Sequence, residues 1–133
     1  MTITIPGPVN TTLKVLATAR LNVRDQLRHL DLNVHLYLPD DVTQVPCVVI
    51  GRPSIEDGVS IVAADFLVSV PVMVLGRPVR DDDAQQQLDQ VADLVIDRLV
   101  QEQPISVTPE TESVAGLTYP AYLITVSVPY RLC

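Results

Sequence analysis

The stretch from Asp65 to Gln101 constrains the fold most strongly, because its apolar residues change spacing partway along. From Phe66 to Val74 they recur at every second position, in the sequence DFLVSVPVMVLGRP. This alternation predicts a strand with one buried face. From about Asp82 to Gln101 they recur every three or four positions, which predicts an amphipathic helix. A long strand that runs directly into a long helix is therefore the expected centre of the fold.

Weaker signals flank this unit. Residues 1–9 contain two prolines and a glycine and are expected to form an irregular leader. A first helix is predicted over about residues 10–30, from Asn10 as N-cap and from the helical spacing of its apolar residues. Three more segments predict strands, namely LNVHLYLP (32–39), CVVIGRP (47–53) and AYLITVSVPYRL (121–132).

Two segments between these elements carry little periodicity. Residues 53–64 are expected to be a loop, and residues 105–120 a short strand followed by a turn. Pro71 cannot donate to a ladder, so its strand is predicted to be an edge strand or to be bulged there. The order of helix, three strands, helix, and one or two strands indicates an α+β fold. We expect one domain over 1–133, with a mostly antiparallel four- to five-stranded sheet and two main helices packed on one face.

Composition excludes several classes of protein. With 133 residues, 47% hydrophobic and 19% charged, the chain is expected to be globular. Its net charge of −7 argues against a surface that binds nucleic acid. The start MTITIPGPVN lacks the basic and apolar regions of a signal peptide, and no apolar run is long enough to span a bilayer. Two cysteines indicate no disulfide framework, so a soluble protein made in the cytoplasm is expected.

Three consecutive aspartates, Asp81–Asp83, precede the second helix. They do not fit a calcium loop, which needs glycine at its sixth position and an acid at its twelfth, where this chain has Gln86 and Ala92. Carboxylates in the first turn of a helix are stabilised by its unpaired N–H groups and its dipole. These three residues are therefore predicted to begin the helix.

Three further aspartates, Asp89, Asp93 and Asp97, are spaced four apart along this helix. They form a stripe on the side away from its apolar residues, and hence outside the core. Two interpretations remain open for the stripe: a solvated face, or a face that contacts a neighbouring subunit or lines a pore. A metal site is disfavoured because no histidine shares the stripe.

The first helix carries a basic counterpart, Arg20, Arg24 and Arg28, also four apart. Arg20 is expected near the middle of the apolar face, with the other two towards its rim. One interpretation is that the arginine stems pack while their charged ends reach water. The other is that they contact acids of the second helix or of a neighbouring subunit.

No pattern in the chain indicates catalysis or cofactor binding. His29 and His35 have no third ligand at metal spacing and are interpreted as surface or boundary residues. Cys47 opens an apolar strand and is interpreted as buried. The nucleophile elbow, the P-loop and the dinucleotide-binding glycine motif are all missing from the sequence. We therefore expect neither an enzyme nor a cofactor.

Taken in order, these segments resemble the tail terminator proteins of long-tailed bacteriophages, the family of the lambda-type minor tail protein. The resemblance covers about residues 10–130. It rests on TTLKVLATARLNVRDQLRHL leading into LNVHLYLP, on VPCVVIGRPS, and on DFLVSVPVMVLGRP running into DDDAQQQLDQVADLVIDRLV. A final YPAYLITVSVPY lies close to the C-terminus. The turn between the long strand and the D-x-x-A-x-x-x-L-D helix is most similar to actinobacteriophage members.

The resemblance implies a virion protein at the tail–neck junction, assembled in the host cytoplasm as a hexameric ring. Such a ring caps the tail tube, ends tail polymerisation and meets the head-completion proteins, while DNA passes through its lumen without specific binding. The aspartate and arginine stripes are then candidate subunit-interface or lumen residues. The alternative is a head-closure or connector protein of the phage neck. A small α+β ligand-binding domain or enzyme is a third, less favoured possibility.

Overall fold

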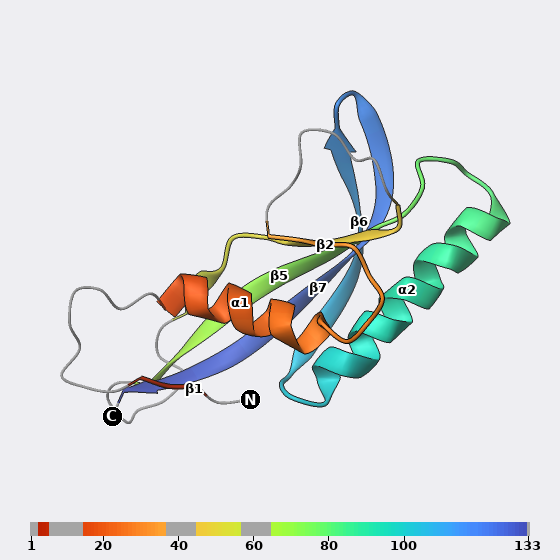
Figure 1. Ribbon diagram of the computed structural model, residues 1–133. Coiled ribbons are helices and arrows are strands. Elements are labelled where there is room, and N and C mark those ends of the chain that lie inside the picture. Colours follow the sequence, from red (N-terminus) through yellow and green to blue (C-terminus); the bar gives the residue numbers. More distant parts are fainter. Residues whose placement is uncertain (1–2, 6–14, 37–44, 57–64, 133) are drawn as a thin grey trace.

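The computed structural model describes residues 3–5, 15–36, 45–56 and 65–132. Within these ranges the chain forms two helices and seven strands, arranged as in Figure 1. In chain order they are β1 (Ile3–Ile5), α1 (Val15–Leu27), β2 (Val34–His35), β3 (Cys47–Ile50), β4 (Ser54–Glu56), β5 (Asp65–Leu75), α2 (Asp82–Val100), β6 (Ile105–Val114) and β7 (Leu117–Leu132). The α+β class is confirmed.

The sheet is mixed and larger than expected. Along its main path the order is β1-β7-β5-β3-β2, with β4 beside β5 and β6 beside β7. The pairs β1–β7 and β2–β3 are parallel, and the remaining pairs among the described strands are antiparallel. The prediction of four to five strands was wrong because β1 and β4 are three-residue strands inside segments that were assigned to the leader and to a loop.

The element bounds also differ from the predictions. The first helix spans Val15–Leu27, and residues 10–14 lie outside the described residues. The predicted strand over 32–39 contributes only Val34–His35 to the sheet, and residues 37–39 are not described. The predicted loop 53–64 includes β4, while residues 57–64 are not described. The second helix agrees with its prediction, since α2 spans Asp82–Val100 and Gln101 is its C-cap.

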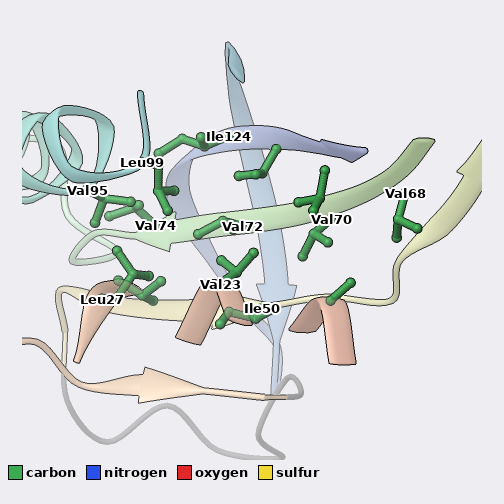
Figure 2. Packing of buried hydrophobic residues seen from close by; sticks show 14 of the residues in the cluster. Val23, Leu27, Ile50, Val68, Val70, Val72, Val74, Val95, Leu99 and Ile124 are labelled. Carbon is green, nitrogen blue, oxygen red and sulfur yellow. The ribbon is translucent and has the colours of Figure 1, made fainter. Parts of the chain in front are cut away.

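Both helices pack on one face of the sheet, as predicted. The alternate valines of β5 point to this face together with residues of β3 and β7 (Figure 2). From α1 they meet Ala19, Val23 and Leu27, and from α2 they meet Leu88, Val95 and Leu99, all of which are buried. This core of aliphatic residues holds the helices in place. α1 lies over β3 and β5, and α2 lies over β5, β7 and β6.

β5 is an inner strand, so of the two expectations for Pro71, an edge strand or a bulge, the edge is wrong. β7 pairs along one side of it, and β3 and β4 pair along the other. Between β3 and β4, residues 51–53 lie opposite residues 70–71 of β5. The β3–β4 segment therefore has one residue more than β5 at this point, which is a β-bulge. The Gly51 N–H donates to the Pro71 carbonyl at 2.8 Å. The missing N–H of Pro71 therefore faces the bulge, where the ladder is already interrupted.

The segment 105–120 was predicted as a short strand followed by a turn; the turn is confirmed, but the strand is a long one that forms a β-hairpin with β7. β6 and β7 pair from Val114↔Leu117 back to Ile105↔Val126, and the turn consists of Ala115 and Gly116. Both turn residues have positive φ, at 53° and 83°, as a two-residue type I′ turn requires. The hairpin extends beyond the rest of the sheet (Figure 1).

A second, smaller cluster lies near this hairpin. Val114, Tyr119 and Ala121 are buried with Cys47, Val49 and Leu75. Cys47 is 1% exposed, so its interpretation as a buried residue is confirmed. Burial raises the pKa of the Cys47 thiol, because it disfavours the charged thiolate. This thiol is therefore poorly suited to act as a nucleophile.

Candidate interaction surfaces

The aspartates before and within α2 divide into two groups. Asp81 is the N-cap, with φ −141° and ψ 163°, and its Oδ1 accepts from the Ala84 N–H at 2.6 Å. Asp82 and Asp83 occupy the first turn of the helix. The predicted role of Asp81–Asp83 in beginning the helix is thus confirmed, and it leaves Asp89, Asp93 and Asp97 as a separate feature.

The three later aspartates lie outside the buried side of α2, as their spacing predicts. Asp93 and Asp97 are exposed, whereas Asp89 is half-buried. The Tyr122 O–H of β7 donates to Asp89 Oδ1 at 2.8 Å, and Gln85 Nε2 donates to the same oxygen at 2.8 Å. Asp89 is therefore a structural contact that fastens α2 to the sheet, in addition to being part of the stripe.

The contact with Asp89 also changes the pKa of Tyr122. The hydrogen bond to Asp89 raises the pKa of Tyr122 above its ordinary value, and partial burial and the charge of the same carboxylate add to the effect. Below its pKa the phenol keeps the proton that it donates. The contact between α2 and β7 is thus intact at neutral pH.

A groove lies beside this contact, between α2 and the β6–β7 hairpin. It has a volume of about 270 Å³, and its lining is Asp89, Ala92, Asp93, Ile96, Val107 and Tyr122. Its polar groups are two carboxylates and a phenol, and the rest of its lining is apolar. A cationic side chain with an apolar stem matches such a groove in charge and shape. We call it the acidic groove.

The three arginines of α1 are placed differently from the prediction. The middle of the buried side belongs to Ala19, Val23 and Leu27, and Arg20 lies at its rim, half-buried. Arg20 Nη2 donates to the Ile50 carbonyl at 3.2 Å, at the end of β3. Its Nε is buried, and no acceptor for it lies within the described residues.

Arg24 and Arg28 pair within their own helix. Asp25 Oδ1 lies 3.5 Å from Arg24 Nη2 and 3.3 Å from Arg28 Nη2. All three side chains are largely exposed, so these ion pairs contribute little to stability. Contacts between these arginines and the acids of α2 in the same chain are therefore not what joins the helices. Besides the aliphatic core, the buried amides of Gln26 in α1 and Gln103 just after α2 link the two segments by hydrogen bonds at 3.2 and 3.0 Å.

Arg20 also lines a second groove, on the other face of the sheet. Its volume is about 480 Å³, and its lining is Arg20, Leu36, Val49, Gly51, Arg52, Pro71, Met73, Glu112 and Leu123. Val49, Met73 and Leu123 form one row across β3, β5 and β7, because Met73 pairs with both of the others. Arg52 is exposed and Glu112 is half-buried. We call it the arginine groove.

Sequence reasoning missed Arg52, Glu112 and Tyr122. Arg52 lay at the end of the predicted strand 47–53, with no signal of a role, and Glu112 lay in a strand that was not predicted in full. Tyr122 offered a signal, since a tyrosine on the core-facing side of a strand needs an acceptor for its hydroxyl. Of the two histidines, His29 is exposed and His35 is half-buried, in agreement with their interpretation as surface and boundary residues.

Within the described residues, no group of three or more histidine, cysteine, aspartate or glutamate side chains is placed to hold a metal ion. The helices described here are too short or too polar to cross a membrane. Neither the scan against protein-family models nor the search of curated proteins found a match for this chain. Its function must therefore be inferred from its residues, surfaces and element order.

Proposed function

We propose that this chain is a tail-terminator subunit, a structural virion protein that caps the tail tube of a long-tailed phage. In this role it ends tail polymerisation and offers a surface to the head-completion proteins. The proposal starts from the resemblance in element order, in which a long strand runs through a short turn into an aspartate-capped helix. It assigns the protein no reaction and no cofactor.

The outer side of α2 is the observation that carries the proposal. This helix has 19 residues, so it is about 28 Å long. Leu94 and Val100 are 51% and 53% exposed along it, interspersed with the exposed Asp93 and Asp97. A long helix that combines bare apolar side chains with charges suits contact with a neighbouring protein. Subunits of an assembled ring need such surfaces.

The negative charge of the chain is compatible with passage of DNA. A channel lined by carboxylates repels phosphates, so that DNA slides through without being held. With a net charge of −7, the protein lacks the basic excess of a DNA-binding ring. Asp97 is the member of the stripe that we assign to the channel side, because it lies outside the acidic groove and is exposed.

A tube-length assay tests the proposal. Tail tubes are assembled from the tail-tube protein of the same phage, with increasing amounts of this chain, and their lengths and ends are measured by electron microscopy. We expect shorter tubes with an added ring at one end. Heat-denatured protein is the control and should leave tube length unchanged.

The same preparation separates the alternatives. Rings that bind DNA-filled heads and leave tube ends bare would replace the terminator by a head-closure or connector protein. A protein that binds neither structure, remains monomeric and takes up a small ligand would refute both phage functions.

A further inference from the structure

The two charged grooves lie on different faces of the sheet. β5 occupies one side of β7 along residues 121–131, so β6 must lie on the other side of β7. One edge is therefore formed by β6 and β1, and the other by β2 and β4 (Figure 1). The acidic groove lies at the first edge, since its lining includes Val107 of β6. The arginine groove lies on the sheet face away from the helices, and its lining runs from Arg20 and Arg52 near the end of β3 to Glu112 of β6.

The two grooves are complementary in charge and in apolar character. Two aspartates give the acidic groove a formal charge of −2. Two arginines and one glutamate give the arginine groove +2 − 1 = +1. Each edge also carries an exposed apolar side chain, Val107 on β6 and Ile55 on β4. Charges of opposite sign, each beside apolar surface, are the arrangement found at specific protein interfaces.

The arginine groove has unused capacity for a carboxylate. A guanidinium has five N–H donors in a fixed fork, and the Ile50 carbonyl is the only acceptor for Arg20 within the described residues. Arg52 is exposed beside the same groove. The exposed guanidinium of Arg52 can donate two parallel hydrogen bonds to a carboxylate, and the charge of Arg20 lines the same groove.

We propose that the acidic groove of one copy docks against the arginine groove of the next copy, with Asp89 and Asp93 facing Arg20 and Arg52. This inference rests on the proposed function and names the lateral contact of the ring. An interface between two different surfaces of the same chain is heterologous, and it generates a closed ring when the rotation between copies closes.

Charge reversal tests this pairing. Asp93→Arg and Arg52→Glu each place like charges opposite one another, while both positions are exposed and so leave the core intact. We expect each variant to weaken self-association roughly tenfold or more, measured by sedimentation velocity at low salt. Asp31→Arg and Arg80→Glu are the matched controls, because they change charge equally at exposed positions outside both grooves. Circular dichroism verifies that all four variants are folded.

Rescue gives the sharper result. In a 1:1 mixture of the two single variants, every contact between unlike subunits again joins opposite charges. The mixture should therefore form rings of alternating subunits, which any even-numbered ring permits, and the double variant Asp93→Arg/Arg52→Glu should form rings alone. A lack of rescue in both would overturn the pairing.

The remaining outcomes separate this inference from the proposed function. Wild-type rings that cap tail tubes, together with equally stable rings of both single variants, would sink the pairing and leave the terminator role standing. A wild-type chain that stays monomeric up to roughly 1 mM, the limit of a weak interface, would overturn the lateral contact. If this chain also failed to shorten tail tubes, the terminator role would fall with it.

Discussion

The turn of the β6–β7 hairpin provides the sharpest prediction about stability. Ala115 has φ 53°, in the left-handed region that costs an L-residue roughly 1–2 kcal/mol. Ala115→Gly removes this strain, while the greater freedom of glycine in the unfolded chain returns about 0.4–1 kcal/mol of it. We therefore expect Ala115→Gly to raise the free energy of unfolding by about 0.5–1 kcal/mol.

The neighbouring residue supplies the reverse experiment. Gly116 has φ 83°, and a Cβ built there meets nothing within 4 Å, so Gly116→Ala adds backbone strain without a steric clash. It should lower the free energy of unfolding by about 0.5–1.5 kcal/mol. Both values come from urea denaturation monitored by circular dichroism.

A matched substitution isolates the backbone as the cause. Ala17 is exposed within α1, and Ala17→Gly should destabilise by about 0.5–1 kcal/mol, because glycine is a poor helix former. The same chemical change thus has opposite signs at positions 17 and 115. If Ala115→Gly destabilised as much as Ala17→Gly, the left-handed turn and the hairpin register would be wrong.

Three further predictions concern α2 and its contacts. Asp81→Ala should cost about 1 kcal/mol by removing the N-cap, and Asp81→Asn should retain most of that stability in the same denaturation assay. Gln103→Leu should destabilise by about 2 kcal/mol, because it leaves the buried Gln26 amide short of a partner, and adding Gln26→Leu should recover part of the loss. Tyr122→Phe should cost about 1 kcal/mol at pH 7 by removing the hydrogen bond to Asp89. Since the pKa of Tyr122 is raised on folding, the difference in free energy of unfolding between the wild type and Tyr122→Phe should be constant below pH 10. It should shrink as pH rises through the folded-state pKa of Tyr122. A difference that stays constant up to the highest pH at which the protein folds would contradict this prediction.

The parts of the fold that were predictable from sequence are those with long, regular periodicity. In β5 and β7, which are long strands with a neighbour on each side, apolar residues recur at every second position. α2 carries a clear cap and a continuous apolar side. β6 was recognised only in part, because residues 106–111 are exposed on both faces and give no signal of period two. Its turn has the sequence Ala-Gly rather than the more recognisable Asn-Gly.

The position of Pro71 illustrates a different limit. A proline inside a strand predicts an edge or a bulge, but the sequence does not reveal which partner is bulged. Here the segment from β3 to β4 has the extra residue, so β5, which contains the proline, stays inside the sheet. Local rules describe the chemistry of one residue, whereas the register of its neighbour determines the outcome.

The candidate surfaces were likewise predictable only along each helix. Helical spacing placed the aspartates outside the core, yet the hydrogen bond from Tyr122 to Asp89 joins residues 33 positions apart. The same applies to Arg20 and Ile50, which are 30 positions apart. Contacts of this kind follow from the order of strands in the sheet, and the sequence pattern does not encode that order locally.

Electron cryomicroscopy of the tail tube end, at a resolution that shows side chains, tests the central claim most directly. We predict a closed ring of this chain seated on the last ring of tube protein, with Asp93 of each copy beside Arg52 of the next. A tube end that lacks this chain, or that is closed by another protein while this chain is bound elsewhere in the neck, would contradict the tail-terminator function.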